Sequence, residues 1–359
     1  MFISSLFSGI TKYFVSQTRS LVRLSKDKVG VIGVPSCKGQ SAGGVQHGPK
    51  ALRQAGIIDK LTQLGVEVYD YGDLVFEQFD DDTPILGLKN PKNIGLAAKK
   101  ISDQVSRVIK DDQIALTLGG DHSLSIGTIH GHAAAEKNMC LVWVDAHADI
   151  NTPLTSPSGN VHGMALSFLV KELKEYIPQI PHFEWIKPCI SAKDIAYIGL
   201  RDLDPGELWI VRNMGISCFT MHEVDRYGID MVLRMSMQAI NPHGDRPIHL
   251  SFDVDSLDPR ISAATGTPVP GGLSVREGIY IAEELAATGK LTAVDLVEVN
   301  PLLGTKEERD LTVYAATEIA RACFGKKREG NIPPGYVLPR PDTTTVASSA
   351  KYGEEVERP

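Results

Sequence analysis

The sequence lacks several features that would assign the protein to a particular class. Its five cysteines include no Cys-x-x-Cys pair and are too sparse for a disulfide scaffold, so we expect reduced core thiols. The alternative, a nucleophilic cysteine, would need an activating turn, and none is recognisable. No apolar run approaches the length of about 20 residues that a membrane span requires.

Positive charge is also scarce. The formal net charge is −7, and no long Lys/Arg run creates a local basic surface. These properties argue against a nucleic-acid binder, because such proteins need a basic field that attracts phosphates. With 42% hydrophobic and 23% charged residues, the 359-residue chain has the composition of a globular protein with one large core. The expected partner is therefore a small molecule.

The two ends of the chain differ in composition from the rest. Residues 1–28 are basic and rich in Ser and Thr, with Asp27 as their one acid, which is typical of a mitochondrial transit peptide. We expect a mitochondrial matrix location, and the alternative is a frayed tail on a cytoplasmic protein. Residues 326–359 open with basic residues and continue with prolines, so we expect a tail without regular structure, available for oligomer contacts.

Residues 29–325 contain no internal repeat, heptad series or linker, so we expect one domain. Short apolar runs alternate there with segments of helical period, which predicts a three-layer α/β/α fold with an eight-stranded, mainly parallel sheet. One helix is expected from Pro49 to Gly65, and another begins at the capping box formed by Ser274 and Glu277. The expected strands are 29–34, 66–69, 114–118, 139–144, 195–200, 216–219, 248–252 and 293–297.

Polar side chains follow three of these strands at the point where each strand ends. They are His122 after the third strand, Asp145, His147 and Asp149 after the fourth, and Asp253 and Asp255 after the seventh. The carboxyl ends of parallel strands share one edge of a sheet, and residues two apart in extended chain point to the same side. We therefore expect all six side chains to converge.

Such a cluster predicts a metal site. Close carboxylates without a cation would repel one another at high cost. Four carboxylates and two imidazoles without a thiolate suit Mn²⁺, with Co²⁺, Fe²⁺ and Zn²⁺ as rivals, and six ligands exceed the need of one ion. The glycine-rich segment 33–41 lacks the Gly-Lys-Ser order of a phosphate-binding loop and is set aside.

Three segments resemble the signature motifs of the ureohydrolase family. They are Gly119–Ser123, Asp145–Asp149 and Ser251–Pro259, and the similarity extends from about Val29 to Asn331. The continuation of the second segment to Gly163 resembles the arginase branch of that family.

The resemblance implies two Mn²⁺ per subunit. By this similarity one ion is held by His122, Asp145, Asp149 and Asp253, and the other by Asp145, His147, Asp253 and Asp255. Asp145 and Asp253 would bridge the two ions.

The same resemblance implies a reaction, in which L-arginine and water yield L-ornithine and urea through attack of a metal-bridging hydroxide on the guanidinium carbon. Glu298 matches the carboxylate that binds the guanidinium, and Asp149 the group that hydrogen-bonds the leaving amine. His162 matches a proton shuttle to solvent.

Substrate specificity is expected in a second set of residues. By resemblance, the α-carboxylate contacts Asn151, Ser158 and Asn160, the α-ammonium contacts Asp204 with Glu207 at the same end, and Thr267 lines the pocket. Agmatine lacks the α-carboxylate, so the carboxylate-binding loop favours arginine. Ser156 and Pro270 depart from the family pattern and bear on affinity rather than on the reaction.

Three alternatives remain at this stage. An agmatinase or other guanidino-acid amidinohydrolase would use the same metals on another substrate, and a metal-deacetylase-like hydrolase would need fewer ligands. A catalytically silent relative would lack at least one ligand, and none is missing. The resemblance also implies a homotrimer, with Arg328 at an interface position.

Overall fold

Eight strands form one sheet in the computed structural model, which describes residues 28–332 and 336–340. Each pair of neighbouring strands is parallel. The strands are β1 (Lys28–Val34), β2 (Glu67–Asp73), β3 (Ile114–Gly119), β4 (Cys140–Val144), β5 (Ile195–Leu200), β6 (Ser217–Thr220), β7 (Ile248–Asp253) and β8 (Leu291–Val297).

The spatial order of the strands differs from their order in the chain. It runs β2-β1-β3-β8-β7-β4-β5-β6, so that β8 and β7 lie between β3 and β4. The predicted eight-stranded parallel sheet is confirmed. The observed strand ends differ by a few residues, most clearly at β2, which continues to Asp73, and at β8, which begins at Leu291.

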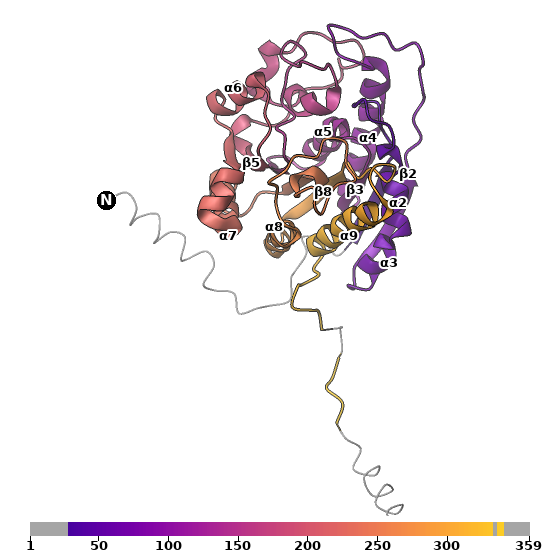
Figure 1. The fold of residues 1–359 in the computed structure, drawn as a ribbon, viewed down its shortest axis with the longest axis vertical. Coiled ribbons are helices and arrows are strands. Elements are labelled where there is room, and N and C mark those ends of the chain that lie inside the picture. Colours follow the sequence, from indigo (N-terminus) through magenta and orange to yellow (C-terminus); the bar gives the residue numbers. More distant parts are fainter. Residues whose placement is uncertain (1–27, 333–335, 341–359) are drawn as a thin grey trace, which may run out of the picture.

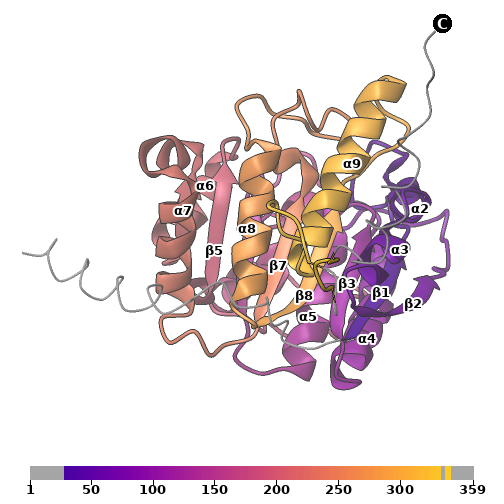
Figure 2. The same ribbon diagram turned by 90° about the horizontal axis from the view of Figure 1, so that it is seen from below.

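Helices cover both faces of the sheet. Figure 1 shows β3 and β8 between a layer with α4 and α5 and a layer with α8 and α9, and Figure 2 shows α7, α8 and α9 side by side. The helices are α2 (Gly48–Gln54), α3 (Ile57–Thr62), α4 (Pro91–Lys110), α5 (Ser125–Ala135), α6 (Pro205–Asn213), α7 (Met221–Ile240), α8 (Val275–Ala287) and α9 (Lys306–Cys323).

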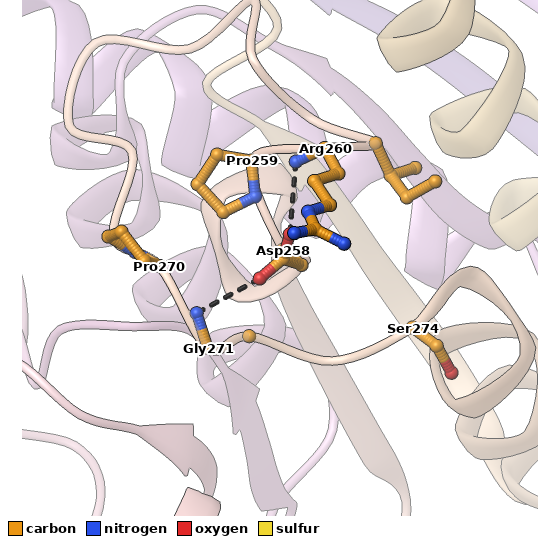
Figure 3. A pocket seen from close by; sticks show the side chains of 8 residues that line it. Asp258, Pro259, Arg260, Pro270, Gly271 and Ser274 are labelled. Carbon is orange, nitrogen blue, oxygen red and sulfur yellow. Dashed lines mark hydrogen bonds between the residues drawn. The ribbon is translucent and has the colours of Figure 1, made fainter.

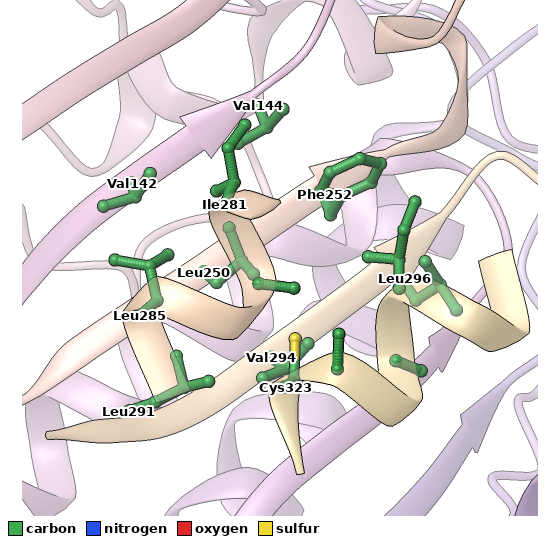
Figure 4. Close-up of a cluster of buried hydrophobic side chains, with 14 of the residues drawn as sticks. Val142, Val144, Leu250, Phe252, Ile281, Leu285, Leu291, Val294, Leu296 and Cys323 are labelled. Carbon is green, nitrogen blue, oxygen red and sulfur yellow. The ribbon is translucent and has the colours of Figure 1, made fainter. Parts of the chain in front are cut away.

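The largest part of the core lies between the central strands and the α8–α9 layer (Figure 4). Leu250 and Phe252 of β7 pack there with Ile281 and Leu285 of α8, and each of the four side chains is fully buried. The central strands β3, β8, β7 and β4 are buried on both faces because helices cover both, whereas the edge strand β2 is largely exposed.

The expected helix from Pro49 to Gly65 is wrong in one respect. The segment forms two helices, α2 and α3, because Gly56 has a φ of +79°, a left-handed conformation that interrupts helical hydrogen bonding. The capping box at the start of α8 is as expected, since the Glu277 amide donates to Ser274 Oγ and the Ser274 amide donates to Glu277 Oε2.

The ends of the chain are only partly described. Residues 1–27, which contain nearly all of the expected transit peptide, lie outside the described residues, whereas Lys28 begins β1. Residues 326–332 and 336–340 form no helix or strand. None of the helices described is long and apolar enough to cross a membrane.

The packing of β7 against α8 yields the first prediction. Leu250→Ala should lower the free energy of unfolding by about 2–5 kcal/mol, because it leaves a cavity in a fully buried site. Leu302→Ala is the control, since Leu302 is 61% exposed, and it should cost less than about 0.5 kcal/mol. Urea unfolding at a fixed protein concentration measures both, and equal losses would contradict the assignment of this core.

Candidate metal centre

The order of the strands brings four chain segments to one edge of the sheet. His122 follows β3, Glu298 follows β8, Asp253 ends β7, and Asp145 follows β4. Because β3, β8, β7 and β4 are consecutive neighbours in the sheet, the segments at their carboxyl ends are neighbours too. The predicted convergence of these residues therefore has a simple topological cause.

The His122 imidazole lies at the centre of the first group of possible ligands. Its Nδ1 atom is 3.1 Å from Asp145 Oδ2, 3.1 Å from Asp149 Oδ2 and 3.2 Å from Asp253 Oδ2. This nitrogen is fully buried and has no hydrogen-bond partner among the described residues. A buried nitrogen surrounded by three carboxylate oxygens is an arrangement that a cation would complete.

A second group of possible ligands surrounds His147. Its Nδ1 atom lies 3.1 Å from Asp255 Oδ2 and 3.5 Å from Asp145 Oδ1. Asp145 belongs to both groups, with one oxygen facing each histidine. The structure thus brings together all six predicted ligands as two adjoining clusters that share a carboxylate.

The charges in these clusters are unfavourable without a cation. Burial, followed by repulsion from neighbouring carboxylates, raises the pKa of Asp149, Asp253 and Asp255, the last to about 6. Burial also acts to raise the pKa of Asp145, but its two histidine neighbours hold it below the usual range. Divalent cations would remove this repulsion, so the residues present fit a metal centre of more than one ion.

Residues behind the ligands fix their orientation. Trp143 stacks on the His122 ring at a centroid distance of 4.0 Å and donates from Nε1 to Asp145 Oδ2 at 2.9 Å. Ser251 Oγ lies 2.8 Å from His122 Nε2, which leaves Nδ1 to face the carboxylates. Neither Trp143 nor Ser251 was among the predicted site residues, although each carries a polar group in a buried strand.

Glu298 lies beside this cluster in a strained conformation. Its φ is +66° and that of Asp149 is +50°, both in the left-handed region that residues other than glycine rarely adopt. The Glu298 carboxylate is buried and accepts hydrogen bonds from the His122 amide at 2.8 Å and from Gln40 Nε2 at 2.5 Å. Gln40 was missed because it lies in the glycine-rich segment that had been set aside.

The His162 side chain lies between Glu298 and the protein surface. Its Nδ1 atom is 3.7 Å from Glu298 Oε1, and its side chain is 17% exposed. Burial acts to lower the pKa of His162, but the carboxylates of Glu298, Asp149 and Asp121 together raise it to about 9. A protonatable group thus lies between the cluster and the surface.

Asp204 and Glu207, predicted to bind the α-ammonium, are hydrogen-bonded to each other, and Asp204 is also bonded to Asn151, which is predicted to bind the α-carboxylate. Asn151 Nδ2 donates to Asp204 Oδ2 at 2.8 Å, and Asn151 Oδ1 accepts from Thr155 Oγ1 at 2.8 Å. Glu207 is buried beneath them, where its carboxylate accepts from the amides of Asp204 and Ile150. Burial and the nearby Asp149 raise the pKa of Glu207 to about 8.

The remaining predicted pocket residues lie around the same region. Ser158 is exposed and Asn160 is half-buried, and Asn160 Oδ1 accepts from Lys89 Nζ at 3.2 Å. Thr267 Oγ1 donates to Asp255 Oδ2 at 3.0 Å, which connects the pocket to the second ligand group. Lys89 was not among the predicted site residues.

A surface hollow of about 640 Å³ lies elsewhere, between residues 258–261 and 270–274. Its loops are joined by hydrogen bonds from the Gly271 and Arg260 amides to the Asp258 carboxylate (Figure 3). None of the predicted site residues lines it, and its lining offers a single carboxylate. The candidate site is therefore the buried carboxylate cluster.

Comparisons with known proteins agree with this geometry. The model of the arginase family matches residues 27–325. Arginase-1 of Bos taurus is 54% identical over 313 residues, covering 87% of this chain and 97% of that protein. Arginase-1 of Homo sapiens is 53% identical over 307 residues, covering 85% and 95% respectively.

The fold comparison gives the same result. The solved structure of arginase from Bacillus subtilis has a TM-score of 0.75 and 37% identity to this chain, and the match covers 84% of this chain and 99% of that one. The predicted fold class is confirmed, as is the resemblance that carried the expectation of an arginase-type hydrolase. The chain belongs to the arginase family.

Proposed function

We propose that the protein hydrolyses L-arginine to L-ornithine and urea at a pair of Mn²⁺ ions. The observation that carries the proposal is the double ligand cluster, in which His122 and His147 each face buried carboxylates and share Asp145. Membership in the arginase family supports the choice of substrate.

The donor set favours Mn²⁺. One ion would be held by His122, Asp145, Asp149 and Asp253, and the other by Asp145, His147, Asp253 and Asp255. Carboxylate oxygens and imidazole nitrogens without sulfur suit this metal. When bound, the pair would supply the positive charge that lowers the pKa of water to near neutrality.

The chain's own residues would bind and orient the substrate. The buried Glu298 carboxylate can accept paired hydrogen bonds from a planar guanidinium, since its strained backbone and its bonds to Gln40 and His122 fix its direction. Asp149 would hydrogen-bond the amine that leaves. His162, partly exposed and close to Glu298, would carry a proton between the site and solvent.

The second candidate function is the hydrolysis of agmatine or of another guanidino compound. The loop 151–162 favours arginine, because Asn160 and Ser158 offer neutral donors that suit an α-carboxylate. Agmatine has no such group. Asp204 would bind the α-ammonium, with Glu207 holding its backbone, and Thr267 would line the pocket beside Asp255.

We further propose a homotrimer in the mitochondrial matrix. The location rests on the basic, Ser- and Thr-rich composition of residues 1–28. The trimer rests on family resemblance at Arg328, which donates from Nε to Glu283 Oε2 at 2.7 Å.

The substrate assignment is tested by comparing two guanidino compounds. The Mn²⁺-loaded protein should release urea from arginine with a higher kcat/KM than from agmatine, because only arginine carries the α-carboxylate that the 151–162 loop would bind. Steady-state urea production measures both rates. A higher kcat/KM for agmatine would contradict the proposal and favour the second candidate.

The ligand assignment is tested at His122. His122→Asn should lower the rate of urea release by more than about 100-fold, because it removes a proposed metal ligand. Loss of a residue that only hydrogen-bonds to a metal ligand already lowers metal affinity or activity by about 10- to 100-fold. His243→Asn is the matched control, because His243 lies exposed in the loop before β7. Unchanged urea release by His122→Asn would contradict the proposed site.

The repulsion between the carboxylates gives a prediction about stability. In metal-free protein, Asp253→Asn should raise the melting temperature by about 2–4 °C, because it removes a carboxyl group whose ionisation is opposed by burial and by the neighbouring Asp255 and Asp145, which raise its pKa. The same variant should gain less stability from added Mn²⁺ than the wild type gains.

Asp245→Asn serves as the control for this measurement, because Asp245 is exposed in a loop. It should leave the melting temperature of the metal-free protein unchanged. Differential scanning calorimetry with and without Mn²⁺ measures these effects, and a lower melting temperature for metal-free Asp253→Asn would show that the carboxylates do not repel.

A further inference from the structure

We propose that Lys89 is a specificity-determining residue that selects substrates with an α-carboxylate. This assignment rests on the proposed arginine hydrolysis. Lys89 is exposed, and its Nζ atom donates a hydrogen bond to Asn160 Oδ1 at 3.2 Å. The Lys89 ammonium therefore lies beside a residue that is predicted to bind the α-carboxylate.

The backbone of Lys89 is held firmly by the turn before it. Leu86 and Gly87 have φ values of +51° and +81°, and Ile85 and Leu88 exchange two backbone hydrogen bonds across this tight turn. Leu88 is fully buried in a cluster that includes Val161, which directly follows Asn160 in the chain. The turn is therefore anchored to the loop that carries the predicted carboxylate donors.

A close backbone contact fixes the distance between the two loops. The Lys89 amide donates to the Gly159 carbonyl at 2.9 Å, and a Cβ on Gly159 would lie 1.9 Å from the Gly87 carbonyl oxygen. Gly159 itself has a φ of +71°. Only glycine suits such a position, and the fit places Lys89 next to Asn160.

The contact also determines which way the Asn160 amide faces. An ammonium can only donate hydrogen bonds, so the Asn160 atom that faces it must be the oxygen. The NH₂ group of Asn160 is then left to donate to another acceptor, such as a carboxylate. Asn151 differs, because its own amide oxygen and nitrogen are already paired with Thr155 and Asp204.

Charge gives the second reason for the assignment. The predicted donors to the α-carboxylate, Asn151, Ser158 and Asn160, are all neutral, so Lys89 adds a positive charge beside them. Because Lys89 is exposed, solvent weakens its attraction for a carboxylate, and we expect a change of about three- to tenfold rather than an all-or-none effect.

The test compares arginine with agmatine in Lys89 variants. Lys89→Gln should lower kcat/KM for arginine by about three- to tenfold, mainly through KM, and leave kcat/KM for agmatine unchanged. Lys89→Arg keeps the charge and should retain most of the preference. Lys110→Gln is the control, because Lys110 is exposed at the C-terminal end of α4, and it should change neither value.

A binding measurement separates recognition from catalysis. By calorimetry, Lys89→Gln should weaken the binding of L-ornithine by a similar factor and leave the binding of putrescine, which has no carboxylate, unchanged. Added salt should weaken ornithine binding to the wild type more than to Lys89→Gln.

The outcomes distinguish this assignment from the proposed function. Equal losses for arginine and agmatine would mean that Lys89 only supports the loop, and no loss for either would mean that it has no part in selection. Either result would overturn the assignment while wild-type arginine hydrolysis stands. A wild-type protein that releases no urea from arginine would overturn both.

Discussion

Electrostatic repulsion between buried carboxylates is the constraint on which the rest of the site depends. Asp145, Asp149, Asp253 and Asp255 lie around two histidines and are almost completely removed from water. Buried like charges this close raise one another's pKa and destabilise the fold unless a cation neutralises them. Three features hold the ligand side chains close together. They are the left-handed backbone at Asp149, the stacking of Trp143 on His122, and the hydrogen bond between Ser251 and His122. Bound cations would make this close approach of carboxylates favourable.

The sheet supplies this arrangement through the insertion of β7 and β8 between β3 and β4. Each of these four strands is buried on both faces, and one or more polar residues lie at or just after its carboxyl end. The proposed substrate residues lie instead in the loops around this edge of the sheet. Asn151 is hydrogen-bonded to both Thr155 and Asp204, and Lys89 contacts Asn160. The candidate metal ligands thus follow strands, and the residues proposed to select the substrate lie in loops.

Much of this could be predicted from the sequence. The alternation of short apolar runs with helical segments predicted the parallel sheet, and the Asp and His residues that follow those runs predicted the ligands, because both patterns are local properties of the chain. The strand order could not be predicted, since it depends on which helices pack on which face. The break at Gly56 was missed because Leu52, Ile58 and Leu61 fit one helical stripe. Gln40 and Lys89 were missed because their partners are distant in sequence. Gln40 bonds to Glu298, about 260 residues away, and Lys89 bonds to Asn160, about 70 residues away.

The central claim is that the cluster binds two cations that share Asp145. Its most direct test is a crystal of the protein grown with Mn²⁺ and measured at the manganese absorption edge. We expect two anomalous peaks, one within bonding distance of His122 Nδ1 and one within bonding distance of His147 Nδ1, with Asp145 bound to both. A single peak, or peaks away from these two histidines, would contradict it.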